Sequence, residues 1–283
     1  MDYFITEPNS VIIAAAIIGL VVGSFLNVVI HRLPIMVQRS WKQDCAELLE
    51  VSTNITPEKF DLILPPSRCP NCSHTITVLE NIPIISYIFL RGRCSSCNKK
   101  ISIRYPIIEF SSMLLAAITA WKFGYGWPLF GALLLTWSLL AASIIDLDHL
   151  LLPDSIVLPL LWLGILFNIF ATYTNLETSI IGAMIGYLSL WSVYWGFKLL
   201  TGKEGMGYGD FKLLAALGAW LGWQSIPGII FLSSLVGAVI GISLVILKIQ
   251  SQDKPIPFGP FLATAGWLHL IWGDYLINLW IGS

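Results

Sequence analysis

Long apolar runs separated by short polar segments dominate this chain. Eight of these runs approach the ~20 residues that a helix needs to cross a bilayer. They cover about residues 11–30, 107–123, 127–145, 156–173, 180–200, 211–225, 227–248 and 258–281. Only the first connection is long and polar, over residues 31–105. The pattern predicts an all-α integral membrane protein of about eight transmembrane helices, the sixth of them short, with an insert between helices 1 and 2.

Composition supports a membrane environment. Hydrophobic residues make up 56% of the chain and charged residues 12%, whereas a soluble domain is about one quarter charged. The first run lacks a basic segment before it and a small-residue cleavage site after it, so we expect a retained anchor and not a signal peptide.

Basic residues predict the orientation in the membrane. Ten of the sixteen Lys and Arg residues lie in the segment 31–105, which the positive-inside rule assigns to the cytoplasm. The N-terminus is then periplasmic, and the loops 146–155, 201–210 and 249–257 are cytoplasmic. The segment 31–105 has a net charge of +4, from ten basic and six acidic residues, so anionic membrane lipid is an expected neighbour.

The insert contains two Cys-x-x-Cys pairs with the spacing of a tetrathiolate zinc ribbon. The four cysteines are Cys69, Cys72, Cys94 and Cys97. Two disulfides or a redox pair are the alternatives, but a cytoplasmic location disfavours the first and doubling of the motif disfavours the second. The spacing predicts one structural Zn²⁺ per chain, and Cys45 falls outside the pattern.

Two aspartates, Asp146 and Asp210, lie at the ends of apolar runs on the predicted cytoplasmic side. An ionisable group in such a place indicates a functional site. Two facing carboxylates can hydrolyse a peptide bond, because close like charges cannot both ionise and one becomes the acid while the other becomes the base. Glycines at positions 205, 207 and 209 would let an extended substrate approach Asp210.

Other interpretations of these aspartates stay open. Asp146 has no evident capping role, since Asp154 or Ser155 can cap the next helix, but it could be a simple interfacial residue. Asp148 could be the working residue instead. Asp210 could cap a helix that starts at Phe211, aided by the helix dipole.

Five motifs in order resemble the bacterial prepilin peptidases, also called type IV leader peptidases, a family of GxGD-type aspartyl proteases. They are Gly23–Pro34, the four cysteines, Arg104–Glu109, Asp146–Asp154 and Gly205–Leu213. The resemblance covers nearly the full length. It implies that 1–30 is a transmembrane anchor, 31–105 a cytoplasmic four-cysteine zinc-binding domain with a possible methyltransferase part, and 106–283 a polytopic aspartyl peptidase domain.

The resemblance also implies an activity. Family members act at the cytoplasmic face of the bacterial inner membrane, where they remove the basic leader of type IV prepilins and type II secretion pseudopilins after a Gly. They then N-methylate the new N-terminal residue with S-adenosylmethionine. By this resemblance Asp146 and Asp210 are catalytic and the four cysteines bind a structural zinc ion.

The methyl-donor site is poorly marked. No Gly-rich dinucleotide-type motif occurs in the insert, and Arg104 and Glu109 are only weak candidates, for which helix packing or a positive-inside role is the favoured interpretation. We expect no nucleic-acid partner, and the sequence does not set the oligomeric state.

Competing function classes explain less of the sequence. An ion-coupled transporter would place its carboxylates near the midplane of paired repeats. A zinc-ribbon scaffold would leave the aspartates unexplained, and a zinc metalloprotease would need the absent His-Glu-x-x-His motif.

Overall fold

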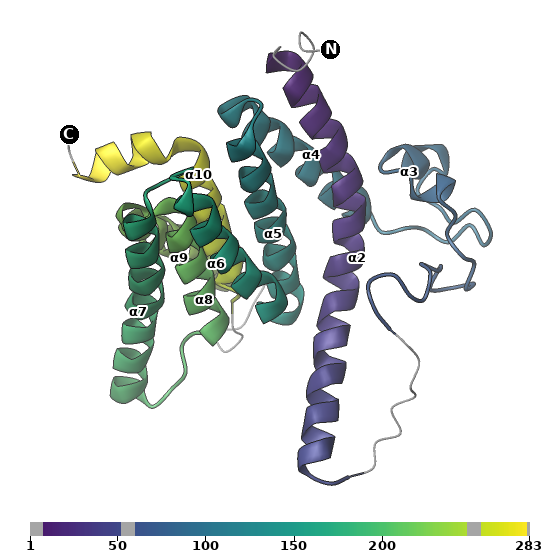
Figure 1. Ribbon diagram of the computed structural model, residues 1–283. Coiled ribbons are helices and arrows are strands. Elements are labelled where there is room, and N and C mark those ends of the chain that lie inside the picture. Colours follow the sequence, from purple (N-terminus) through teal and green to yellow (C-terminus); the bar gives the residue numbers. More distant parts are fainter. Residues whose placement is uncertain (1–7, 52–59, 248–255, 282–283) are drawn as a thin grey trace. The chain divides into compact units, whose positions relative to one another are not determined.

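The computed structural model of the chain describes residues 8–51, 60–247 and 256–281 (Figure 1). The chain forms two compact units, Met1–Tyr125 and Gly126–Ser283. Within the described ranges the regular structure is helical, apart from two isolated β-bridges. The predicted all-α class is therefore confirmed.

In the first unit, α2 (Pro8–Leu48) pairs with α4 (Arg104–Phe123). The two backbones approach closely: a Cβ added at Gly19 would lie 2.7 Å from Ala116 Cβ, and one at Gly23 would lie 2.8 Å from Glu109 Cα. Ser112 Oγ also donates a hydrogen bond to the carbonyl of Gly19 at 2.5 Å. Small residues and hydroxyl bonds of this kind hold membrane helices together, because lipid supplies no hydrophobic drive for helix association.

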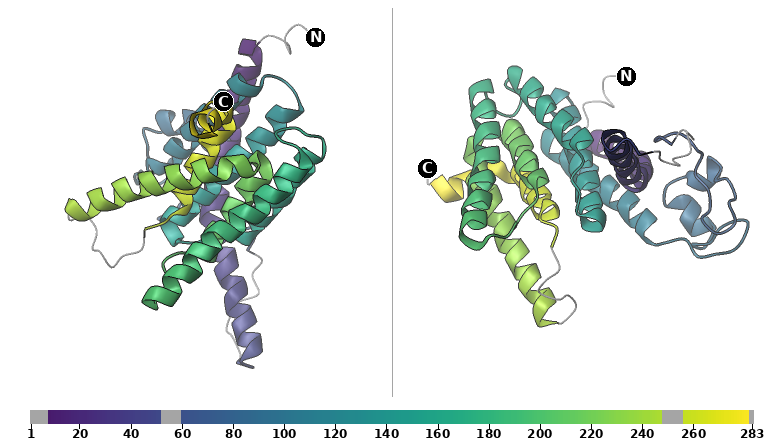
Figure 2. Two further views of the ribbon diagram at one scale, coloured as in Figure 1. Left: turned by 90° about the vertical axis from the view of Figure 1, so that its left-hand side faces the viewer. Right: turned by 90° about the horizontal axis from the view of Figure 1, so that it is seen from below.

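Helix α2 is much longer than the predicted span 11–30. Its 41 residues correspond to about 60 Å, roughly twice the hydrocarbon thickness of a bilayer. The left view in Figure 2 shows its C-terminal half extending past the end of α4. Beyond Ile30 the helix contacts the insert: Arg32, which is buried, donates hydrogen bonds to the carbonyls of Asp61 (3.0 Å) and Pro65 (2.6 Å). The insert thus begins as a solvent-exposed extension of the first membrane helix.

The rest of the insert has little regular structure. It contains a 3₁₀ turn, η1 (Leu79–Asn81), and one short helix, α3 (Ile85–Phe89). The bridges pair Arg68 with Thr75 and Arg93 with Lys100.

The second unit is a helical bundle with a short helix at its centre. Its elements are α5 (Trp127–His149), α6 (Asp154–Ile169), α7 (Leu176–Thr201), α8 (Tyr208–Leu221), η2 (Trp223–Ser225), α9 (Ile226–Ile246) and α10 (Gly259–Ile281). Helix α8 packs against α6, α7 and α10, and its residues Leu213–Trp220 are all buried.

The environment of α8 explains why the sixth predicted span is short. Its 14 residues cover only about 21 Å, but protein surrounds it, so it need not match the bilayer. Gly182 on α7 and Gly218 on α8 meet backbone to backbone, with no room for a Cβ on either. Trp220 Nε1 donates to the carbonyl of Leu160 at 2.8 Å.

Each of the eight predicted spans coincides with a helix. Five helices among the described residues are long and apolar enough to cross a membrane: α2, α4, α5, α7 and the continuous segment Trp223–Ile246. Helix α6 is apolar but shorter. The chain is therefore a membrane protein. The N-terminal residues 1–7 and most of the predicted loop 249–257 lie outside the described residues.

Candidate active site and metal centre

Asp146 lies in the last turn of α5, with only 6% of its surface exposed. Its Oδ2 accepts a hydrogen bond from the backbone N–H of Gly259, the first residue of α10, at 3.0 Å. The expectation that Asp146 has no capping role was therefore wrong: its carboxylate caps α10. Helix α6 has Pro153 as its N-cap and no side-chain capping bond, although Asp154 or Ser155 was the expected cap.

Asp210 lies in the first turn of α8 and is 7% exposed. The helix begins at Tyr208 and its N-cap is Gly207, which makes no side-chain capping bond. Asp210 is thus not the N-cap of a helix starting at Phe211. Its carboxylate lies at the positive end of the α8 dipole, which favours a negative charge there.

The two carboxyl groups are close enough to interact electrostatically. Leu152, in the loop after Asp146, packs between their supporting backbones. A Cβ added at Gly209 would lie 2.7 Å from Leu152 Cβ, and one added at Gly259 would lie 3.2 Å from Leu152 Cδ2. The loop after α5, the start of α8 and the start of α10 therefore meet at one place, with the aspartates in it.

An ion pair supports the same junction. Lys212 Nζ, near the N-terminal end of α8, bonds both carboxylate oxygens of Asp154, at 2.7 and 2.8 Å. Asp148, in contrast, is exposed. Burial therefore distinguishes Asp146 from Asp148, which the sequence left as alternatives.

The four predicted zinc ligands come together in the first unit. The Sγ atoms of Cys69, Cys72, Cys94 and Cys97 all lie within 4.8 Å of one another. The Cys69–Cys97 distance is 3.8 Å and the Cys72–Cys94 distance 3.9 Å. Sulfurs at about 2.3 Å from a tetrahedral zinc ion stand about 3.8 Å apart, so this donor set fits zinc.

The two knuckles have the same backbone geometry. The N–H of Cys69 donates to the carbonyl of His74, and the N–H of Cys94 donates to that of Lys99, both at 2.9 Å. Ser73 and Asn98, the fourth residue after each first cysteine, have positive φ angles of 58° and 56°. Each turn therefore presents two sulfurs on one side.

Backbone amides also favour the thiolate form that a metal needs. The N–H groups of Asn71 and Cys72 lower the pKa of the Cys69 thiol to about 6. The N–H of Lys99 lowers the pKa of Cys97. The N–H of His74 lowers the pKa of Cys72, but burial and the neighbouring thiols outweigh it and raise that pKa to about 11. Cys69 and Cys97 are thus the ligands favoured as thiolates before any metal binds.

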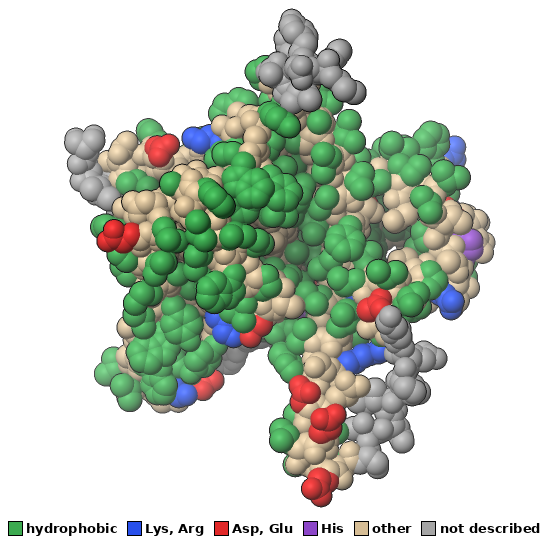
Figure 3. Space-filling model, in the orientation of Figure 1, with side chains coloured by type: hydrophobic (Ala, Val, Ile, Leu, Met, Phe, Trp, Pro, Cys, Tyr) green, Lys and Arg blue, Asp and Glu red, His purple; other side chains and the backbone are tan. Residues whose placement is uncertain are grey.

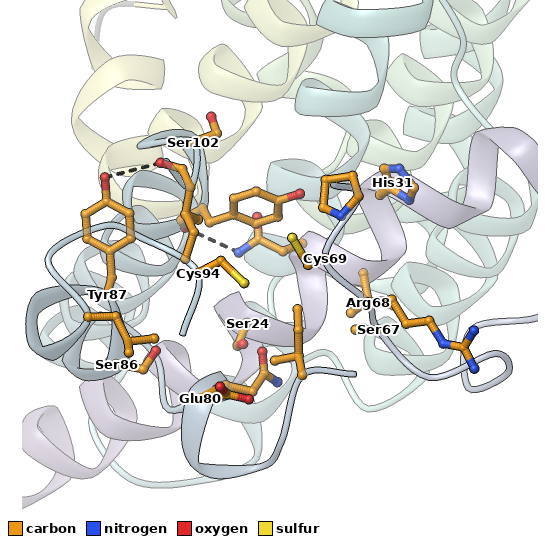
Figure 4. Close-up of a pocket in the computed structure, with 18 of the residues that line it drawn as sticks. Ser24, His31, Ser67, Arg68, Cys69, Glu80, Ser86, Tyr87, Cys94 and Ser102 are labelled. Atoms are coloured by element: carbon orange, nitrogen blue, oxygen red, sulfur yellow. Dashed lines mark hydrogen bonds between the residues drawn. The ribbon is translucent and has the colours of Figure 1, made fainter. Parts of the chain in front are cut away.

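A cavity of about 560 Å³ lies next to the cysteines, between α2, the insert and α4 (Figure 4). Glu109 lines it and is buried, and its Oε2 accepts the N–H of Ile84 at 2.8 Å. Arg104 is exposed and does not line it. Of the two weak candidates for a cofactor site, the structure therefore brings only Glu109 to a cavity.

Sequence reasoning missed two partners of the aspartates. Gly259 holds Asp146 through its N–H, and Leu152 separates the glycines at positions 209 and 259. The Gly259-Pro260 pair that opens α10 was the available signal, because proline is favoured in the first turn of a helix.

Comparison with known proteins agrees with this arrangement. Residues 17–123 match the bacterial peptidase A24 N-terminal domain, and residues 133–242 match the type IV leader peptidase family. A prepilin leader peptidase/N-methyltransferase of Stutzerimonas stutzeri is 55% identical over 98% of this chain and 96% of its own length.

The chain belongs to the type IV leader peptidase family. The proteins of the same description from Pseudomonas aeruginosa and Aeromonas hydrophila are 52% and 55% identical, over 99% and 93% of this chain and 97% and 91% of their own lengths. No solved structure matches the chain. The predicted membership of the leader peptidase family is confirmed.

Proposed function

We propose that this chain is a membrane aspartic endopeptidase that removes the leader of type IV prepilins and pseudopilins and then N-methylates the new N-terminus. The observation that carries the peptidase part is the pair of buried, interacting carboxylates of Asp146 and Asp210 on separate helices of one unit. The names of its relatives, prepilin leader peptidase/N-methyltransferase, support both activities.

In this proposal the aspartates share one proton. The ionised carboxylate takes a proton from water as the water attacks the scissile carbonyl, and the protonated one donates a hydrogen bond to the carbonyl oxygen. The N–H of Gly259 stabilises a charge on Asp146, whereas nearby negative charge opposes ionisation of a second carboxyl group. The exposed Asp148 takes no part.

The second reaction belongs to the first unit. When bound, S-adenosylmethionine would supply the methyl group: the neutral amine exposed by the cut would form the new C–N bond as the methyl–sulfur bond breaks, S-adenosylhomocysteine would leave, and the amine would release a proton. We place the donor in the cavity beside the cysteines, whose volume falls within the range of small-molecule sites. Glu109 supplies negative charge toward the donor's cationic groups, and Tyr87 and Tyr105 offer aromatic surface to its base.

Zinc has a structural role in this proposal. Cys69, Cys72, Cys94 and Cys97 would hold it and fix the loop that forms one wall of the cavity. All four positions go to protein ligands, so none is left for substrate. The division of labour follows the units: the first unit, which contains the insert and α4 with Glu109, supports methyl transfer, and the second unit carries the peptidase. The boundary in this proposal therefore falls after α4 and not at residue 106.

The orientation follows the basic residues. The N-terminus lies in the periplasm, and the segment 31–105 and both aspartates lie on the cytoplasmic side of the inner membrane. A basic leader is on that side before cleavage. Acidic side chains could bind the basic leader, but Asp154 and Glu204 are already paired. Asp154 pairs with Lys212 at 2.7 Å, and Glu204 pairs with Lys198 at 2.8 Å.

The test separates the two reactions with two conservative variants. Purified Asp210→Asn protein should not cut a full-length prepilin but should methylate a precut one. Glu109→Gln, which can still accept the N–H of Ile84, should cut the prepilin and leave its new N-terminus unmethylated. Both products are read by mass spectrometry with and without S-adenosylmethionine.

Loss of methyl transfer in a folded Asp210→Asn protein would show that the reactions share residues in the second unit. Normal methylation by Glu109→Gln would exclude its carboxylate from the donor site.

A further inference from the structure

The insert exposes an apolar segment that the rest of the first unit leaves uncovered in the described structure. Residues 78–89 contain η1 and α3 and expose large apolar side chains: Val78 at 87%, Leu79 at 76%, Ile88 at 67% and Phe89 at 82%. Figure 3 shows hydrophobic side chains gathered over this part of the first unit. A water-soluble domain rarely exposes such a cluster without a partner.

A hydrogen bond fixes the depth of this segment. The N–H of Ile84 donates to Oε2 of Glu109 at 2.8 Å. Glu109 is the sixth residue of α4, about 7.5 Å along the helix from Arg104. The segment therefore lies beside a membrane-crossing helix and not beyond its end.

The packing of Glu109 on helix α2 gives the same depth. Glu109 packs on Gly23, where an added Cβ would lie 2.8 Å from Glu109 Cα. Gly23 is seven residues, about 10 Å, inside the apolar run that ends at Ile30. Figure 1 accordingly shows α3 at the level of α4 and of the N-terminal half of α2, while the polar half of α2 extends away from both.

The backbone of the segment is suited to a dry environment. Amides without a partner are costly in lipid, and here the N–H groups of Ile82, Ser86, Ile88 and Leu90 all donate to backbone carbonyls. Pro83 has no N–H, and the N–H of Ile84 donates to the Glu109 carboxylate. The segment's acidic residue, Glu80, is held internally by Thr77 and Ser95.

Basic side chains come after this segment in the sequence. Arg91, Arg93, Lys99 and Lys100 are all exposed. Such residues reach lipid headgroups from the edge of a buried apolar element.

We propose that residues 78–89 form a re-entrant element of the insert whose exposed apolar side chains contact lipid acyl chains. On α4, beside which the segment lies, Ile107 and Phe110 also expose apolar surface, at 54% and 50%. The element would place the cavity and the zinc knuckles at the membrane surface, where the N-terminus of a cleaved membrane-bound pilin lies.

A depth measurement tests this directly and does not depend on enzymatic activity. A fluorescent amino acid replaces Phe89 in the full chain, with one copy per nanodisc of phosphatidylethanolamine and phosphatidylglycerol and without substrate. Phe110 on α4 is the lipid-facing reference and Glu47 on the exposed end of α2 the water-facing one. Quenching is measured with acyl-chain nitroxide lipids and with aqueous iodide.

At Phe89 we expect nitroxide quenching within about two-fold of that at Phe110 and little quenching by iodide, with the reverse at Glu47. Quenching by iodide alone would place the segment in water and overturn the proposal. Protection from both quenchers would show that protein covers the segment and would overturn it as well. A probe at Val78 repeats the test should Phe89 not tolerate one.

Discussion

Replacing Gly259 by alanine should disable proteolysis without replacing a catalytic side chain. A Cβ at this position would lie 2.6 Å from Asp146 Oδ2 and 3.2 Å from Leu152 Cδ2. The Asp146 carboxylate must therefore move by a large fraction of an ångström, and its bond to the Gly259 N–H must lengthen. Misplacement of a reacting group by about 1 Å costs about 100-fold in rate, so we expect kcat for prepilin cleavage to fall about 100-fold.

The effect on stability should be modest. Overpacking of this kind costs about 1–3 kcal/mol, and alanine recovers part of it because it favours a helix more than glycine does. Gly273→Ala is the matched control in the same helix, since nothing lies within 4 Å of its added Cβ. It should cleave like the wild type.

The assay is cleavage of a synthetic prepilin in detergent, with thermal unfolding followed in parallel. Wild-type kcat in Gly259→Ala protein would refute the idea that this contact positions Asp146. Equal losses in both glycine variants would point to a general effect on α10.

Two further outcomes test other parts of the structure. Purified protein should contain one zinc per chain, and the Cys94→Ser variant should lose it. Because zinc binding contributes on the order of 10 kcal/mol to the folding of a small domain, the insert of this variant should become sensitive to protease while the second unit stays folded. Elemental analysis that finds no zinc in the wild type would contradict this. Lys212→Met removes the partly exposed ion pair to Asp154, which contributes about 0.2–1 kcal/mol to stability. This variant should therefore lower cleavage only a few-fold and leave the melting temperature nearly unchanged. Complete loss of cleavage would give Lys212 a direct role.

Much of the fold followed from hydrophobic periodicity and spacing. The eight apolar runs became helices, and each tight turn gathers two cysteines locally. The two turns then meet across 22 to 28 residues, as the spacing of the pairs predicted. Helix α2 was underestimated, since its extension is polar and makes contacts far away in the sequence: Arg32 donates to carbonyls about thirty residues later in the chain. No local pattern encodes such a contact.

The candidate site was predictable in its residues but not in its supports. Asp146 and Asp210 were marked by charge at the end of apolar runs, whereas the choice against Asp148 needed burial, which only the packed structure provides. The cap from Gly259 joins positions 113 residues apart. Periodicity carries no information about such pairs.

The most direct test of the aspartyl pair is cleavage of prepilin by Asp146→Asn, Asp210→Asn and Asp148→Asn proteins, each verified to be folded and zinc-bound. If Asp146 and Asp210 share the acid and base roles, each of the first two variants should lose at least about 100-fold in kcat, and Asp148→Asn should stay close to the wild type. Cleavage at the wild-type rate by the Asp146→Asn protein, or loss confined to the Asp148→Asn protein, would contradict the assignment.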